Sequence, residues 1–221
     1  STSCSGFVFP KFNHFVSKAL MAGVIAPIDV TNQLDTTKIE WFNALKKIPG
    51  AEILDVKEWK DEEKRGEDGF MGRDFIHSKS ASVRIVDYVK IPAKCVDPSG
   101  LTEDNFPTLI GPAHFTPRSE SHRGLCHGGS FCALMDDAMG WMGFCVSGKV
   151  KPWSGYTVQV NTSLKKPVPV NSVLKMEAWV TRREGARKYW IGARLSDPND
   201  DELIYCEGEG LFLMSPEAMQ S

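Results

Sequence analysis

The chain has 221 residues, of which 42% are hydrophobic and 24% are charged, and its formal net charge at pH 7 is -2. This length fits one large domain, or one domain with an extension, and the apolar content is sufficient for a sizeable core. The near-neutral charge gives no reason to expect nucleic acid as a partner. No apolar run reaches the length of a membrane span, so we expect a soluble protein.

The six cysteines are scattered along the chain and form no Cys-x-x-Cys pair. Disulfide frameworks are typical of shorter secreted chains, so reduced thiols and an intracellular protein are expected. Cys126 and His127 are adjacent, but no second pair follows at zinc-site spacing, and the sequence predicts no metal. Residues 1–28 contain no acidic side chain. This is faintly similar to the remnant of an organelle transit peptide, so the expected compartment is cytoplasmic or mitochondrial.

Residues 1–80 are predicted to be an N-terminal helical extension. Residues 15–27 are apolar with one lysine and favour a helix that packs on the domain. A second amphipathic helix is predicted for residues 35–48, where Pro49-Gly50 stops it. Residues 55–69 are a run of charged side chains, which we interpret as a solvated helix or linker.

The pattern changes to strands in residues 81–221. Residues 83–91 alternate and are rich in β-favouring side chains, and residues 108–117 predict a further strand. The polar loop 118–124 leads into a long helix. Four strand candidates then follow, separated by short turns, at 156–164, 172–183, 187–196 and 202–214.

Consecutive strands joined by tight turns form an antiparallel meander. A single long helix between early strands and a meander is buried only when the sheet wraps around it. The pattern of residues 81–221 therefore predicts an α+β protein of hotdog architecture, in which an antiparallel sheet wraps a central helix.

The long helix follows His127 and two glycines, and it carries two adjacent carboxylates, Asp136 and Asp137. Asp136 lies about 140° from the apolar stripe, among small residues that allow a ligand or another backbone to approach. Asp137 falls on the opposite flank beside Trp141. The helical phase therefore favours Asp136 as the functional carboxylate, although an aspartate on an amphipathic helix is more often solvated or capping. The core-facing stripe consists of Phe131, Leu134, Met135, Ala138, Met139 and Met142.

The run from His127-Gly128-Gly129 to Asp136 resembles the hotdog-fold acyl-CoA thioesterases of the phenylacetate type. Their helix opens with His-Gly-Gly and carries its catalytic aspartate at this offset. The stretch 157–169 is similar to the family's strand that begins with Thr or Ser and ends in a basic-basic-Pro turn, and residues 185–189 resemble its later Gly-Arg-Lys strand. The resemblance covers roughly residues 83–214, and the subgroup with a helical N-terminal extension is similar in outline.

This resemblance implies hydrolysis of a fatty or aryl acyl-CoA to the free acid and CoA. Gly128 would donate its backbone N–H to the oxyanion at the positive end of the helix dipole, beside Gly129, and His127 would polarise the thioester carbonyl. Asp136 would act either as the general base for water or as the nucleophile. Thr157 would orient the water or the carboxylate through its hydroxyl, although threonine is equally a β-favouring residue at a strand start. No cofactor is implied, because CoA is part of the substrate.

Basic side chains that suit the CoA phosphates occur in three places. Arg187 and Lys188 lie opposite Arg182 across a predicted hairpin, Lys166 ends the strand of the Thr or Ser motif, and Arg123 precedes the helix. Each of these alone is more often a solvated surface charge. The hairpin cluster and Lys166 are the predicted substrate-binding residues.

The resemblance also implies a homodimer or dimer of dimers with active sites between subunits, and we expect Asp136 and Thr157 to come from different chains. The loop 147–155 is longer than in the family, which would reshape the acyl pocket. A non-catalytic acyl-CoA-binding or regulatory hotdog protein is the alternative, and measurable turnover separates the two. The hotdog dehydratases are not favoured, because no Asp-x-Asn-x-x-His pattern is present.

Overall fold

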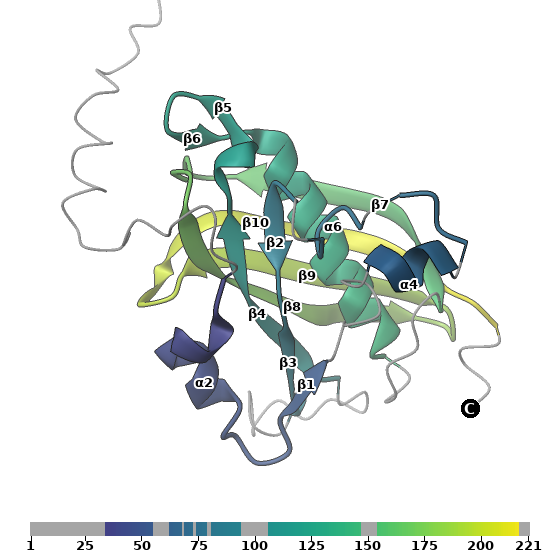
Figure 1. The fold of residues 1–221 in the computed structure, drawn as a ribbon. Helices are drawn as coiled ribbons and strands as arrows, with labels where there is room; N and C mark the ends of the chain where they lie inside the picture. The colour runs from purple at the N-terminus through teal and green to yellow at the C-terminus, as the bar shows by residue number, and fades with distance from the viewer. Residues whose placement is uncertain are drawn as a thin grey trace, which may run out of the picture.

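A curved antiparallel sheet wraps around one long helix in the computed structural model (Figure 1). The structure describes residues 34–54, 62–67, 69–72, 74–78, 81–93, 106–146 and 154–216. The helix predicted for residues 15–27 and most of the loop 147–155 lie outside the described residues. The predicted α+β hotdog fold is confirmed.

The main sheet has eight strands in the order β1-β3-β4-β8-β9-β10-β7, and β2 pairs with β4 beside this path. A short ribbon of β5 (Glu120–His122) and β6 (Leu125–Cys126) precedes the helix. The four strands predicted after the helix are all present, each with its ends within two residues of the prediction. The strands of the main sheet are β1 Glu52–Leu54, β2 Val83–Ile85, β3 Tyr88–Ile91, β4 Thr108–Phe115, β7 Gly155–Leu164, β8 Ser172–Glu184, β9 Lys188–Asp197 and β10 Asp200–Met214.

The single strand predicted for residues 83–91 is wrong, because the chain forms two strands there. β2 pairs with the end of β4, whereas β3 pairs with its beginning. Between them the chain crosses close over Gly111 of β4, where a Cβ atom would lie 2.7 Å from the carbonyl oxygen of Asp87. Only glycine leaves room for this crossing.

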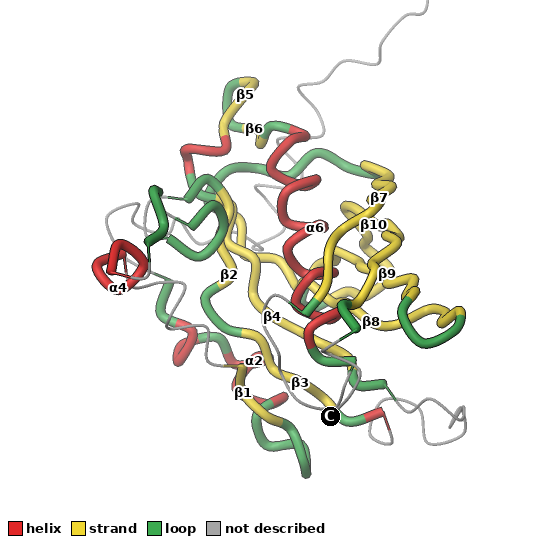
Figure 2. The backbone as a smooth tube through the Cα atoms, turned by 90° about the vertical axis from the view of Figure 1, so that its right-hand side faces the viewer, coloured by secondary structure: helices red, strands yellow, loops and turns green. Residues whose placement is uncertain are grey.

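Helix α6 (Gly128–Phe144) lies in the concave face of the sheet, against β7, β8, β9 and β10 (Figures 1 and 2). All six residues of the predicted core stripe are buried. Each of the Phe, Leu and Met side chains among them contributes roughly 1.5–3 kcal/mol when it is fully buried. The side chains that meet them from the sheet include Met176, Ala178, Ile191, Ala193 and Phe212.

The helix predicted for residues 35–48 is shorter than expected. A 3-10 turn, η1 (Thr36–Lys38), is followed by α2 (Glu40–Leu45), and Ile39 between them has an extended backbone that interrupts the helix. Phe42 of α2 is fully buried against β3 and β4. Phe42 packs with Val89 and Ile110, whereas the alternate strand residues Tyr88 and Leu109 belong to the core around α6. Because side chains alternate between the two faces of a sheet, α2 covers the outer face.

The described part of the extension also adds a strand to the sheet, since β1 pairs antiparallel with β3. The charged run 55–69 contains α4 (Glu62–Glu67), in which Arg65 is buried and lies 3.7 Å from Asp74 in an ion pair. That part of the run is therefore not purely solvated. The division of the chain at residue 80 stays a prediction.

Candidate active site

His127 is the N-cap of α6. Its Nδ1 accepts the N–H of Gly129 at 2.8 Å, and its backbone carbonyl accepts the hydroxyl of Ser130 at 2.6 Å. Because Nδ1 is an acceptor, the neutral ring carries its proton on Nε2, which is left to donate at the start of the helix. A Cβ atom on residue 129 would lie 2.9 Å from Nδ1. A larger residue at position 129 would therefore crowd the His127 ring in this orientation.

Gly128 is the first residue of α6, so its N–H has no partner within the helix. No acceptor for this N–H is found among the described residues. The nearest side chain is Leu164, whose Cδ1 would lie 3.1 Å from a Cβ on residue 128. The predicted oxyanion donor therefore points its N–H outward at the positive end of the helix dipole, and its catalytic role stays a prediction.

Asp136 and Thr157 meet within one chain. The Thr157 hydroxyl donates to Asp136 Oδ1 at 2.9 Å, both side chains are exposed, and Oδ2 has no donor among the described residues. The expectation that these two residues come from different chains is wrong. The reason is that β7 runs beside α6 and brings its first residues to the middle of the helix.

A β-bulge turns Thr157 toward the helix. In β7, Val160 packs on the core and Thr162 contacts Cys132 of α6, so alternation alone places Thr157 on the opposite face. The pairing with β10 shifts at this point, however, and leaves Val158 without a partner. The extra residue reverses the alternation, as bulges near functional sites often do.

Asp137 is bound on both oxygens by partners that the sequence analysis did not identify. Its Oδ1 lies 3.0 Å from His77 Nε2, and its Oδ2 accepts the hydroxyl of Tyr88 at 2.9 Å. Burial raises the pKa of Tyr88 well above its ordinary value, so this hydroxyl remains a donor. His77 Nδ1 contacts the carbonyl of Ile85 at 3.0 Å, and Trp141 Nε1 lies 3.1 Å from His77 Nε2. The protonated ring donates from Nε2 to Asp137, whereas the neutral ring can accept there from Trp141.

This buried pair makes stability depend on pH. Burial alone would lower the pKa of His77, but the Asp137 carboxylate outweighs it and holds the pKa above its usual value. A raised pKa in the folded state means that the contribution is complete below about pH 6.5 and is lost as the pH rises through the folded-state pKa. We expect the unfolding free energy of His77→Gln to approach that of wild type as the pH rises above about 6.5, measured by urea unfolding at a series of pH values. The exposed His122→Gln is the control, and a constant gap between wild type and His77→Gln would contradict the prediction.

The basic residues Arg182, Arg187 and Lys188 lie on the β8–β9 hairpin, and their role in substrate binding stays a prediction. The Arg182 guanidinium carbon lies 3.7 Å from the ring centroid of Trp190, and Arg187 Nε donates to a carbonyl of β10 at 2.7 Å. Lys188 forms an ion pair with Glu184 at 3.3 Å. The hairpin therefore presents positive charge from side chains that are largely oriented by their neighbours.

Lys166 does not join this cluster. It follows the far end of β7, where its N–H donates to the carbonyl of Tyr205. Thr157, at the other end of β7, is a cross-strand neighbour of Phe212, which in turn pairs with Tyr189 beside the hairpin. The structure thus brings the hairpin cluster to the Thr157 end of the sheet and leaves Lys166 at the end where α6 begins.

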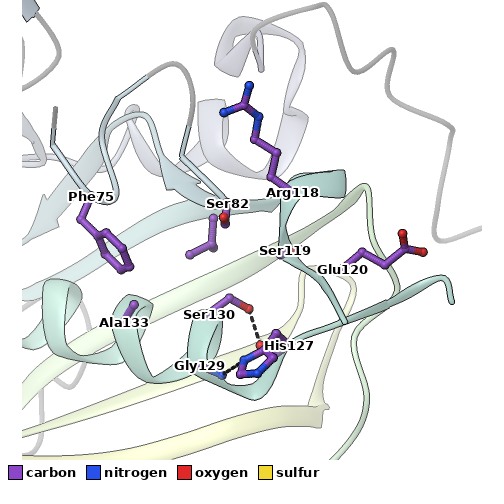
Figure 3. Close-up of a pocket in the computed structure, with 10 residues that line it drawn as sticks. Phe75, Ser82, Arg118, Ser119, Glu120, His127, Gly129, Ser130 and Ala133 are labelled. Atoms are coloured by element: carbon purple, nitrogen blue, oxygen red, sulfur yellow. Dashed lines mark hydrogen bonds between the residues drawn. The ribbon is translucent and has the colours of Figure 1, made fainter. Parts of the chain in front are cut away.

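A pocket of about 430 Å³ lies beside the start of α6 (Figure 3). Its lining combines residues of the helix with residues of the extension, of β2 and of the turn before β5. The lining residues are Phe75, Ser82, Val83, Arg118, Ser119, Glu120, His127, Gly129, Ser130 and Ala133.

Sequence comparison finds acyl-CoA thioesterases. Over 95 residues the chain is 33% identical to acyl-coenzyme A thioesterase THEM4 of Bos taurus. This aligned stretch is 42% of this chain and 36% of that protein. Over 101 residues the chain is 27% identical to acyl-coenzyme A thioesterase THEM5 of Homo sapiens, with 45% and 38% covered. The chain is a hotdog-fold relative of the acyl-CoA thioesterases. The matched stretch spans little more than a third of the length of these curated relatives.

No protein-family model matches this chain. Among solved structures, zebra fish thioesterase superfamily member 2 has a TM-score of 0.48 and 11% identity over 72% of this chain and 94% of that chain. A hypothetical thioesterase protein of Streptococcus pneumoniae with coenzyme A has a TM-score of 0.42 and 15% identity over 49% of this chain and 78% of that chain.

Two further features of the described part of the chain concern membrane spans and metal sites. None of its helices is both long and apolar enough to cross a membrane. Its described His, Cys, Asp and Glu side chains form no group of three or more that could hold a metal ion.

Proposed function

We propose that this protein hydrolyses an acyl-CoA thioester to the free acid and CoA. The observation that carries the proposal is the exposed Asp136 carboxylate, which has one oxygen held by Thr157 and the other without a donor among the described residues. The adjacent Asp137 is fully used by buried partners, so the helix separates a reactive carboxylate from a structural one. The acyl-CoA thioesterase names of the sequence relatives support the same reaction.

The groups on α6 match what thioester hydrolysis needs. The Gly128 N–H and the Nε2–H of His127 stabilise the negative charge that develops on the carbonyl oxygen. With Asp136 as base, a water oxygen bonds to the carbonyl carbon and its proton passes to Asp136. The C–S bond then breaks, and the departing CoA thiolate takes that proton from Asp136. With Asp136 as nucleophile, a carboxylate oxygen bonds to the carbonyl carbon, the C–S bond breaks and CoA leaves as its thiolate. Water then hydrolyses the acyl-aspartate anhydride to the free acid and the Asp136 carboxylate, and a proton from that water goes to the thiolate. Either route balances with water alone and uses no cofactor.

The proposed site requires two copies of the chain. Gly128 and Asp136 are eight residues apart on one helix, which is about 12 Å at 1.5 Å per residue. Attack on a carbonyl needs the reacting atoms about 3–3.5 Å apart. We therefore propose a homodimer, alone or within a dimer of dimers, in which the helix start of one subunit faces Asp136 and Thr157 of the partner subunit.

The edge of the sheet provides a surface for this association. β7 is the last strand in the sheet order, and its Tyr156 and Val158 are 71% and 58% exposed. An open edge with exposed apolar side chains favours pairing with a second strand. We assign the CoA phosphates to Arg182, Arg187 and Lys188, because their hairpin lies at the Thr157 end of the sheet.

Thiol release from short, medium, long and aryl acyl-CoAs tests the proposed reaction. We expect the wild-type protein to release thiol from at least one of these classes. Binding of CoA esters without release of thiol would instead support a non-catalytic acyl-CoA-binding or regulatory protein.

Complementation between two inactive variants tests the shared site. His127→Asn keeps a capping side chain but removes the ring donor, and Asp136→Asn removes the base. After equimolar exchange of subunits, half of the dimers are mixed and each has one intact site, so we expect about a quarter of wild-type turnover. Exchange of Asp136→Asn with the double variant is the control that stays inactive. If mixed dimers form, as native mass spectrometry can verify, and activity does not return, the two-chain site is wrong.

A further inference from the structure

The pocket beside the start of α6 has one wall from the extension. Figure 3 shows the Phe75 ring pointing toward the helix near Ala133, whereas Arg118 and Glu120 point away from it. The Phe75 side chain is 77% exposed although it belongs to the lining. An aromatic ring that faces an open pocket gains burial only when something fills that pocket.

The chemistry of the lining favours an apolar occupant. The hydroxyl of Ser119 donates to the carbonyl of Thr116, and that of Ser130 donates to the carbonyl of His127, each at 2.6 Å. These two donors are therefore already satisfied within the protein. Phe75, together with Val83 and Ala133, supplies the apolar part of the surface.

Phe75 is held in place by anchored neighbours. Asp74 Oδ1 accepts the N–H groups of Ile76 and His77 at 3.0 and 2.6 Å. Ile76 is buried in the core, and His77 contacts Asp137 of α6. The segment 74–78 is thereby attached to the helix that carries the candidate active site, and Phe75 projects from it over the pocket.

We propose that this pocket takes the acyl group of the substrate and that Phe75 determines which acyl groups fit. The inference rests on the proposed thioester hydrolysis. His127 and Gly129 belong to both the pocket and the helix start, so a carbonyl bound at the Gly128 N–H directs its acyl group into the pocket. A volume of about 430 Å³ lies in the range that holds small organic ligands. Phe75 then limits the length of the acyl group from the side of the extension.

The inference predicts a change of chain-length preference in both directions. In Phe75→Ala the ratio of kcat/KM for long over short acyl-CoAs rises by about tenfold or more, because hydrophobic pockets discriminate by this order for each added methylene or larger group. In Phe75→Trp the ratio falls. The change lies mainly in KM, because Phe75 touches the acyl group and not the reacting atoms. Met71→Ala is the matched control, since Met71 lies in the same part of the extension, is fully exposed and is not part of the pocket.

A binding measurement separates this inference from the proposed reaction. In the Asp136→Asn background, calorimetry gives the Kd of each acyl-CoA without turnover. Phe75→Ala is expected to shift the chain-length dependence of Kd toward long acyl groups, whereas Met71→Ala is expected to leave it unchanged. If both variants retain the same dependence in Kd, the acyl pocket is wrong, whatever the turnover. If wild type binds acyl-CoA with a Phe75-dependent preference but releases no thiol, the proposed reaction fails and the acyl pocket stands.

Discussion

Asp136→Asn is expected to lower kcat for acyl-CoA hydrolysis by about 10²- to 10⁴-fold, the usual contribution of a positioned base. The substitution keeps the side chain's size and an oxygen that can accept the Thr157 hydroxyl, which lies 2.9 Å from the native carboxylate. It removes the negative charge, and with it the capacity to take a proton from water or to attack a carbonyl carbon. Steady-state thiol release measures the loss.

The fold of Asp136→Asn is expected to be unchanged, because the Asp136 side chain is exposed and contributes little to the core. Circular dichroism and the urea midpoint verify this before the rates are compared. Glu202→Gln is a suitable control, since it neutralises an exposed carboxylate near the start of β10, whereas Thr157 pairs near the end of that strand. Wild-type turnover in Asp136→Asn would exclude both proposed roles of the carboxylate.

The strands after the helix and the core stripe of α6 were predictable because each is a regular pattern. Period-two alternation and short polar turns locate β7 to β10, and a 3.6-residue period locates the buried face of the helix. The same helical period distinguished Asp136 from Asp137. In each case the residues that decide the structure are neighbours in sequence.

The orientation of Thr157 was not predictable from alternation, because it depends on a register shift between two strands. Pairing of Leu211 with Gln159 and of Phe212 with Thr157 skips Val158. No residue in β7 is special to such a bulge, so the sequence carries no local signal for it. The contact between Asp136 and Thr157 in one chain follows from this shift.

The partners of Asp137 were not found because they are distant in sequence. His77 lies 60 residues and Tyr88 lies 49 residues away from it. A signal was nevertheless present: an aspartate on the flank of Trp141 faces the interior, and a carboxylate there needs hydrogen-bond donors. That argument predicts the need for partners, and only the folded chain identifies them.

Asp137→Ala is expected to lower the unfolding free energy by about 3–5 kcal/mol, the usual cost of removing one member of a buried charged pair. The substitution leaves the His77 imidazole without the carboxylate that holds its proton and leaves the Tyr88 hydroxyl without its acceptor, and both side chains are buried. Urea unfolding monitored by tryptophan fluorescence measures the change, and Trp141 itself lies against His77. Asp137→Asn is expected to lose less, because an amide can still accept from Tyr88.

Asp136→Ala is the matched control for this loss, since it removes the neighbouring carboxylate from the same helix. It is expected to change the unfolding free energy by at most about 0.5 kcal/mol, as is usual for an exposed side chain. Equal losses in the two variants would show that Asp137 is not the structural carboxylate. Unequal losses, with turnover abolished in Asp136→Ala, would mean that one helix turn carries two carboxylates with separate tasks. Asp137 then fixes the segment that carries Phe75 onto α6, and Asp136 performs the chemistry beside it.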